Sequence, residues 1–299
     1  MSAGMPFTVT DAFTLLPVWV LTGAGLVVLA YDLIRRGRGE GAAWLALLGL
    51  LAAGWAVWQV RDLTRPLFGG MLLADAYSVF FQALFVLIGV VSVLVSWDYV
   101  RRADLARGEY YCLLLYATLG MIVMAMAGDL IVFFLGLELM SLSLYVLAGM
   151  RRTLFQSTEA ALKYFLLGAF ASGFLLFGIA LLYGATGTTS LLRMSGGLVE
   201  SPLESNAYLW LGSALLLVGL AFKVSIVPFH MWTPDAYDGA PTSVTAFMSA
   251  GAKAAGFAAL VRIASELLPL LGIEYAQIFQ VLAIATLVVG NVVAIVQNN

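Results

Sequence analysis

The sequence is short of charge. Only 11% of its 299 residues are Asp, Glu, Lys or Arg, against about 25% in an ordinary globular domain, whereas 62% belong to the apolar set. A surface that faces water needs charged side chains, and so few cannot cover a domain of this size. We infer that lipid is the solvent for most of the chain.

Cysteine and histidine are scarcer still, with one of each, Cys112 and His230. These numbers exclude a disulfide framework, a cysteine-ligated iron–sulfur cluster and a zinc site built from several such residues of this chain. The net charge is −2 and the basic residues form no stripe, so nucleic-acid binding is not indicated. We expect this chain to hold no cofactor and no metal.

Long apolar runs fill the sequence instead. A helix that crosses a bilayer needs about 20 mainly apolar residues, because no water is present to satisfy its backbone. The runs lack the alternation of barrel strands, which excludes a barrel. The sequence predicts an all-α, polytopic membrane protein with nine spanning helices, at residues 12–31, 42–60, 75–97, 110–127, 130–149, 159–184, 208–230, 243–264 and 276–296. The longest connection, 185–207, predicts an external loop with one short turn.

Arginine is divided unequally between the loops. Eight arginines follow odd-numbered spans and four follow even-numbered ones, which predicts an external N-terminus because loops rich in Arg stay in the cytoplasm. Arginines follow the first run and none precedes it, the reverse of a secretion signal, so we expect this run to be retained. The sequence stops three residues after the ninth run, and we expect it to be a fragment.

Three charged residues lie deep inside apolar runs: Glu138, Lys223 and Lys253. A charge near the bilayer centre costs at least about 2.5–3.5 kcal/mol, so such residues are candidates for function. Lys163 is a weaker candidate, since it lies one turn into the sixth run and its long stem can reach the headgroups. A functional role and a snorkelling lysine are both open for Lys163.

Hydroxyl groups accompany the deep charges at helical spacing. The two stripes are Thr242, Thr245, Ser249 and Lys253 on the eighth predicted helix, and Glu138, Ser141 and Tyr145 on the fifth. Hydroxyls in membrane helices often only return a hydrogen bond to their own backbone. Because each stripe contains a buried charge, we interpret both as polar paths into the membrane.

Pro228 predicts a broken seventh helix. It has no N–H to donate to the carbonyl of Val224, so the helix should bend or break directly after Lys223. Irregular backbone at this depth survives only beside protein or a wet cavity. A carboxylate beside Lys223 would control its proton affinity. Glu138 is that partner if the fifth and seventh helices meet; otherwise each group pairs across a subunit boundary.

His230 follows the break, with Asp235 and Asp238 nearby. One histidine with two aspartates is weak support for a metal site. A structural histidine at a helix end and a histidine that takes up protons are both open.

Two segments resemble a known family. They are GLELMSLSLYVLAG at 136–149 and FKVSIVPFHMWTPDAYDGAPTSVTAFMSAGAKAAGF at 222–257. Both resemble the antiporter-like membrane subunits of proton-pumping NADH:quinone oxidoreductase, respiratory complex I. The motif MWTPDAYDGAP, with lysine in the eighth predicted helix, resembles the subunit N branch of this family, which corresponds to mitochondrial subunit 2. The resemblance covers the chain from about the fourth predicted helix onward.

The resemblance implies a fold of fourteen helices with two inverted five-helix repeats, each with one broken helix. It divides the chain into an N-terminal three-helix segment at 1–109, a first repeat at 110–264 and the start of a second repeat at 265–299. It implies that Glu138, Lys223 and Lys253 relay protons, with Lys163 in a less certain role. The exit-side lysine of the second repeat lies beyond this sequence.

The resemblance also implies a location in the bacterial inner membrane, beside other membrane subunits of complex I. NADH, FMN, iron–sulfur clusters and quinone would then bind in partner subunits. Two other classes stay open: a subunit of a cation/proton antiporter, and a structural membrane subunit whose charges only fix helix packing.

Overall fold

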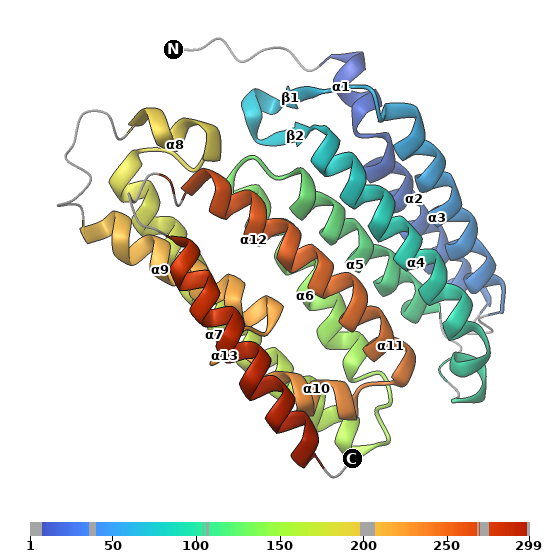
Figure 1. Cartoon of the computed structure of the whole chain (residues 1–299). Coiled ribbons are helices and arrows are strands. Elements are labelled where there is room, and N and C mark those ends of the chain that lie inside the picture. The colour runs from blue at the N-terminus through green and yellow to red at the C-terminus, as the bar shows by residue number, and fades with distance from the viewer. Residues whose placement is uncertain are drawn as a thin grey trace.

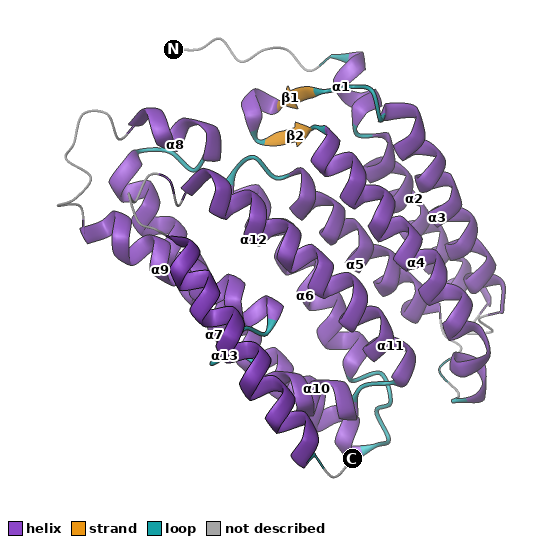
Figure 2. Cartoon of the chain, viewed as in Figure 1, coloured by secondary structure: helices purple, strands orange, loops and turns teal. Residues whose placement is uncertain are grey.

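Long helices make up nearly all of the structure, a computed structural model that describes residues 8–35, 40–103, 105, 108–197, 207–267, 269 and 275–297 (Figure 2). Nine helices among these residues are long and apolar enough to cross a membrane, which confirms the number predicted. They are α2 (Leu16–Arg35), α3 (Glu40–Val60), α4 (Ala76–Arg102), α5 (Gly108–Met126), α6 (Leu130–Ala148), α7 (Phe155–Thr186), α9 (Ala207–Val224), the composite of α11 (Thr242–Phe247), a π-helical turn (Met248–Ala252) and α12 (Lys253–Leu267), and α13 (Tyr275–Val296).

Short elements lie at the two ends of the bundle (Figure 1). At one end are α1 (Val9–Thr14), α8 (Leu191–Gly197) and a hairpin of β1 (Arg65–Leu67) and β2 (Leu72–Ala74), joined by a 3₁₀ turn at Phe68–Gly70; at the other is α10 (Trp232–Gly239). α8 is the short turn predicted in the 185–207 connection. The sequence did not reveal the hairpin, because three-residue strands carry too few residues to show an alternation.

Glycine pairs let the helices approach closely. α5 is the most buried of the described spans, and it packs along α6 where Gly120 faces Gly136. A Cβ atom on Gly120 would lie 2.7 Å from the carbonyl oxygen of Gly136. α7 and α9 meet in the same way, since a Cβ on Gly178 would lie 2.7 Å from the carbonyl oxygen of Gly212. Small residues of this kind favour the van der Waals contact that holds membrane helices together.

An ion pair fastens α12 to the start of α4. Asp75 caps α4 by accepting from the Ser78 N–H at 2.7 Å, and both terminal nitrogens of Arg262 donate to its carboxylate at 2.9 Å. Burial alone would raise the pKa of Asp75, but the bonds from Arg262 and Ser78 outweigh it, so the pKa is lowered. Tyr77 completes the contact, with the guanidinium 4.7 Å from its ring centre.

We expect Arg262→Leu to lower the free energy of unfolding of the full-length protein by about 2 kcal/mol, because a partly buried carboxylate loses its counter-charge. Since the folded state lowers the pKa of Asp75, this stabilisation is present above the ordinary value of 3.8 and is lost as the pH falls below it. Thermal unfolding in detergent at pH 7 and at pH 3 measures both effects.

The matched control is Arg61→Gln, because Arg61 pairs with Asp62 on the surface, where the two side chains are 40% and 83% exposed. Its effect should stay within about 0.5 kcal/mol. An Arg262→Leu protein as stable as this control would contradict the stabilising role of the ion pair between Arg262 and Asp75.

Candidate functional site

The seventh span is broken, as its proline predicts. α9 ends at Val224, and the chain continues through Ser225, whose φ of +61° lies in the left-handed region, and a cis peptide before Pro228. The next helix, α10, begins only at Trp232. The break therefore lies directly after Lys223, where the sequence predicts it.

Side chains from other elements satisfy the backbone at the break. Trp232 Nε1 donates to the carbonyl of Phe222 at 3.0 Å, in the last turn of α9. Thr286 on α13 accepts from the Val227 N–H at 3.1 Å. Polar backbone groups in the interior thus find partners in protein, which a membrane interior demands.

The Lys223 ammonium is almost fully enclosed, with 4% of the residue exposed. It donates to Ser141 Oγ at 2.5 Å, and Ser141 in turn donates to the carbonyl of Leu137, which leaves its oxygen lone pairs for the lysine. The ring centres of Tyr145 and Tyr164 lie 5.7 and 5.9 Å from Lys223 Nζ. One hydroxyl and two aromatic rings therefore hold this charge.

Glu138 does not bond Lys223 directly, although both residues are described and they interact electrostatically. The Lys223 nitrogen and the Glu138 carboxylate oxygens lie more than 4.0 Å apart, the limit for an ion pair. The reason is the position of α7, which packs against both α6 and α9 and whose Ser172 donates to Glu138 Oε1 at 2.5 Å. Ser141, one turn after Glu138, makes the contact with the lysine instead.

Lys253 reaches the same break from the opposite side. It is the first residue of α12, and its Nζ donates to Ser225 Oγ and lies 3.4 Å from the Lys223 carbonyl oxygen. The ring centres of Trp232 and Tyr237, both on α10, lie 4.6 and 5.9 Å from Lys253 Nζ. The Lys253 ammonium therefore reaches the backbone of Lys223 at the end of α9.

The predicted hydroxyl stripe on the eighth span is wrong as a path to Lys253. Thr245 donates to the carbonyl of Tyr237 at 2.9 Å, Ser249 donates to the carbonyl three residues earlier, and Thr242 and Ser249 are exposed. The cause is the π-helical turn directly before Lys253. Its extra residue rotates the following helix by about 100° relative to a continuous α-helix.

Lys163 lies at the edge of the bundle. Its Nζ lies 2.9 Å from Glu159 on α7 and 2.8 Å from Asp235 on α10, and the side chain is 44% exposed. The exposure fits a lysine that reaches the surface, and the ion pair with Asp235 joins α7 to α10. Lys163 does not contact Lys223 or Lys253.

His230 lines a cavity of about 330 Å³ between the break, α10 and α13. His230 Nδ1 and the Tyr237 hydroxyl are buried and have no partner among the described residues. The lining also includes Ser225, the partner of Lys253. Because buried polar atoms of this kind bond to water, we expect a hydrated cavity. Asp235 points to Lys163 instead, and no group of three or more His, Cys, Asp or Glu in the described residues is placed to hold a metal.

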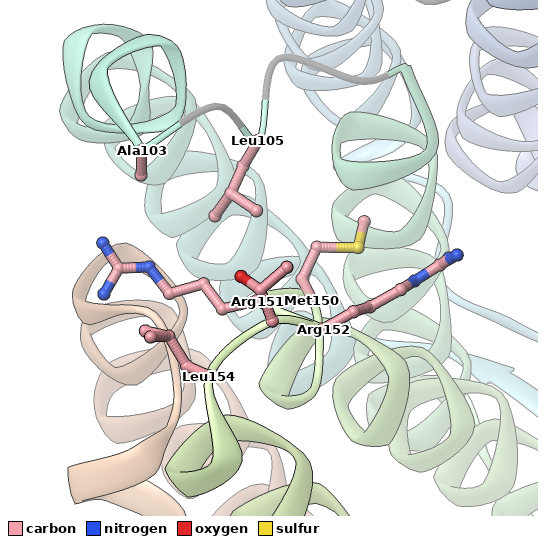
Figure 3. A pocket seen from close by; sticks show the side chains of 7 residues that line it. Ala103, Leu105, Met150, Arg151, Arg152 and Leu154 are labelled. Carbon is pink, nitrogen blue, oxygen red and sulfur yellow. The ribbon is translucent and has the colours of Figure 1, made fainter.

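A second cavity of about 330 Å³ lies away from the lysines, at the ends of α4 and α6 (Figure 3). Arg151 and Arg152 line it, and the Arg151 guanidinium lies 5.4 Å from the ring centre of Tyr99. These arginines lie in the loop between α6 and α7 and contact none of the deep charges.

Comparison with known proteins identifies the family. Residues 127–299 match the family described as NADH:quinone oxidoreductase/Mrp antiporter, TM. The chain is 42% identical over 294 residues to NADH-quinone oxidoreductase subunit N of Trichlorobacter lovleyi, covering 98% of this chain and 60% of that protein. The chain belongs to the NADH-quinone oxidoreductase subunit N family. A second member, subunit N 2 of Roseiflexus castenholzii, is 45% identical over 94% of this chain and 57% of its own length.

Solved structures agree with this family. Respiratory complex I from Thermus thermophilus with bound aureothin contains a chain with a TM-score of 0.76 and 36% identity, matched over 94% of this chain and 58% of that one. The Mrp complex of a Dietzia species contains one with a TM-score of 0.69 and 26% identity, over 87% and 49%. The chain spans about 60% of the length of its curated relatives.

Sequence reasoning missed several partners of the deep charges: Ser172, Ser225, Tyr164 and Trp232. A hydroxyl or an aromatic ring in an apolar run is common, so none of these residues stands out alone. The signal available for Trp232 and Ser225 was their closeness in sequence to Pro228. For Ser172 and Tyr164 only the packing of α7 reveals the role.

We expect a cysteine at Gly290 to react with a charged, water-soluble methanethiosulfonate, because Gly290 lines the His230 cavity and a Cβ there meets no atom within 4 Å. Val288→Cys is the control, since Val288 is an exposed apolar residue of the same helix outside the cavity lining. Reaction at Gly290 should be at least about tenfold faster because only a wet site admits the reagent. The background thiol, Cys112, is buried. Equal rates at the two positions would show that the cavity is dry.

Proposed function

We propose that this chain acts in a proton-translocating membrane subunit of respiratory NADH:quinone oxidoreductase, with Glu138, Lys223 and Lys253 as the proton relay. The observation that carries the proposal is the meeting of two lysines at a helix break inside the membrane, where Lys253 Nζ lies 3.4 Å from the carbonyl oxygen of Lys223. Such charges are costly in a membrane, and ion pathways are the best-known reason for keeping them. Family membership supports the same function.

Repulsion between the two ammonium groups supplies the driving force of the relay. Both lysines lie in a poorly solvated interior, where like charges interact far more strongly than in water. A proton that arrives on Lys223 therefore favours loss of a proton from Lys253. Glu138 opposes this effect, because its negative charge stabilises a protonated Lys223. Movement of Ser172 or Ser141, which hold these two groups, changes the balance.

The cavity at His230 supplies a route for protons to Lys253. Ser225 belongs to the cavity wall and accepts from Lys253, and Thr233 shares a hydrogen bond of 2.6 Å with Ser225. His230 is suited to pass a proton because its two ring nitrogens can donate and accept hydrogen bonds. Lys163 has a supporting role, since its ion pair with Asp235 holds α10 against α7 and its pair with Glu159 lies within α7.

The redox chemistry belongs to partner subunits. One cysteine and one histidine are too few for an iron–sulfur cluster within this sequence. We assign NADH, FMN, iron–sulfur clusters and quinone to those partners, and place the chain in the bacterial inner membrane among other membrane subunits. The N-terminus faces outward, residues 110–264 form the first five-helix repeat, and 265–299 begin the second. The arginine distribution supports this orientation.

We expect Glu138→Gln, Lys223→Met and Lys253→Met each to lower the number of protons pumped per NADH oxidised by the assembled complex in proteoliposomes. Because the three groups share one path, the double variant Lys223→Met/Lys253→Met should lose no more than the more affected single variant. Arg193→Gln, an exposed arginine of α8, is the control and should pump normally. Unchanged stoichiometry in all three single variants would exclude the relay.

A cation/proton antiporter is the second candidate, because the chain also resembles a chain of the Mrp complex. Purification of the full-length protein from its native membrane separates the two functions. A complex I subunit should copurify with flavin and iron–sulfur absorbance and pump protons when NADH is added. Sodium-dependent proton exchange in a preparation without these cofactors would favour the antiporter.

A purely structural subunit is the remaining alternative. It predicts that Lys253→Met changes assembly and leaves pumping per assembled complex intact. Measuring both quantities on the same preparation decides between the two roles.

A further inference from the structure

Trp232 is the residue that joins the two lysines. Its indole is 3% exposed and stacks on Tyr164, with ring centres 4.5 Å apart and planes inclined by 11°. On the same ring lies the Lys253 ammonium, 4.6 Å from the centre, and Tyr164 lies 5.9 Å from the Lys223 ammonium. A continuous pair of rings therefore connects one charge to the other.

Three fixed contacts hold this ring in position. Its Nε1 donates to the Phe222 carbonyl at 3.0 Å, and the Phe222 ring stacks on it with centres 5.4 Å apart. Tyr237 meets it edge-on at 6.1 Å. A buried ring held by a hydrogen bond and three neighbours cannot turn without moving them, because such interiors are close-packed.

The position of the ring matters for the charge it faces. A lysine ammonium over the face of tryptophan is stabilised by the ring quadrupole, more strongly when water is excluded. Lys253 has few other partners: Ser225 Oγ, the carbonyl oxygen of Lys223 and the more distant Tyr237 ring. No carboxylate of the described residues forms an ion pair with it. The indole is therefore a principal stabiliser of protonated Lys253.

We propose that Trp232 is the positioning residue of the relay: its indole face holds the Lys253 ammonium at the α9 break, and its stack on Tyr164 transmits displacements from Lys223 to Lys253. This inference rests on the proposed proton-relay function. In this role Trp232 holds Lys253 in place, which Glu138, Lys223 and Lys253 cannot do themselves. Loss of a proton from Lys253 weakens its attraction to the ring, which frees the lysine to leave the break.

The test replaces Trp232 in the assembled complex with site-specifically incorporated 5-fluoro-, 5,7-difluoro- and 5,6,7-trifluorotryptophan. Fluorine withdraws electron density from the ring face and weakens its hold on a cation, while the shape and the Nε1 donor are nearly unchanged. The measured quantity is the Lys253-dependent pumping rate, which is the rate of each complex minus the rate of the Lys253→Met complex. We expect this rate to fall stepwise, by about three- to tenfold at the trifluoro stage.

The same series at Trp210 is the matched control. Trp210 lies on α9, and no lysine or arginine of the described residues faces its ring. Pumping should not change there. Uncoupled NADH oxidation and copurification of the partner subunits report assembly, and neither should change in either series.

The outcomes distinguish the role of Trp232 from the proposed proton relay on which it rests. Full pumping by the trifluorotryptophan-232 complex, with pumping lowered by Lys253→Met, overturns the role of Trp232 and leaves the relay standing. Normal pumping by Lys253→Met overturns the inference and removes Lys253 from the proposed relay; normal pumping by Glu138→Gln and Lys223→Met as well overturns the relay itself. Trp232→Phe serves as a second variant: it keeps an aromatic face and loses the Nε1 bond. We expect it to retain more Lys253-dependent pumping than Trp232→Leu, and equal pumping by the two would overturn the inference.

Discussion

A helix that ends inside a membrane leaves its last carbonyl groups without helical partners, and lipid offers them no hydrogen bond. α9 ends in this way at Val224. Side chains of three other helices bond the backbone there: Trp232 of α10 and Lys253 of α12 donate to carbonyls of the last turn, and Thr286 of α13 accepts from the Val227 N–H. The break therefore fixes the positions of the elements around it, because each must bring a donor or an acceptor to the same place.

The same contacts bring the charges together. Lys253 bonds the backbone at the break and thereby lies beside Lys223, and Trp232 bonds that backbone and thereby faces Lys253. The hydrogen bonds that satisfy the backbone and the proposed relay therefore use the same atoms. Removal of one donor thus has two consequences, a lost hydrogen bond at the break and a displaced charge, so a variant of the proposed relay must be judged by pumping per assembled complex.

Most of the fold follows from the sequence because the membrane imposes strict rules. Runs of about 20 apolar residues mark the spans, and all nine appear in the structure. Pro228 marks the break, since its missing N–H is a local property. Glu138, Lys223 and Lys253 stand out because charge in an apolar run is rare.

What the sequence could not supply is the arrangement of these residues across helices. Glu138 and Lys223 form no direct ion pair because α7 packs beside them and its Ser172 donates to the Glu138 carboxylate. No pattern within the fifth or seventh run contains that information. The hydroxyl stripe to Lys253 failed for a different reason, because helical spacing assumes a regular helix.

The failed stripe explains how Lys253 faces the break. In a continuous α-helix, a residue four positions after Ser249 lies on the same face, and Ser249 is exposed on the outer surface of this chain. The π-helical turn at Met248–Ala252 adds one residue and rotates the helix that follows by about 100°. Lys253 consequently points at Trp232 and Ser225 instead of outward. The π-helical turn, an irregularity in the eighth span, thus directs Lys253 toward the end of α9.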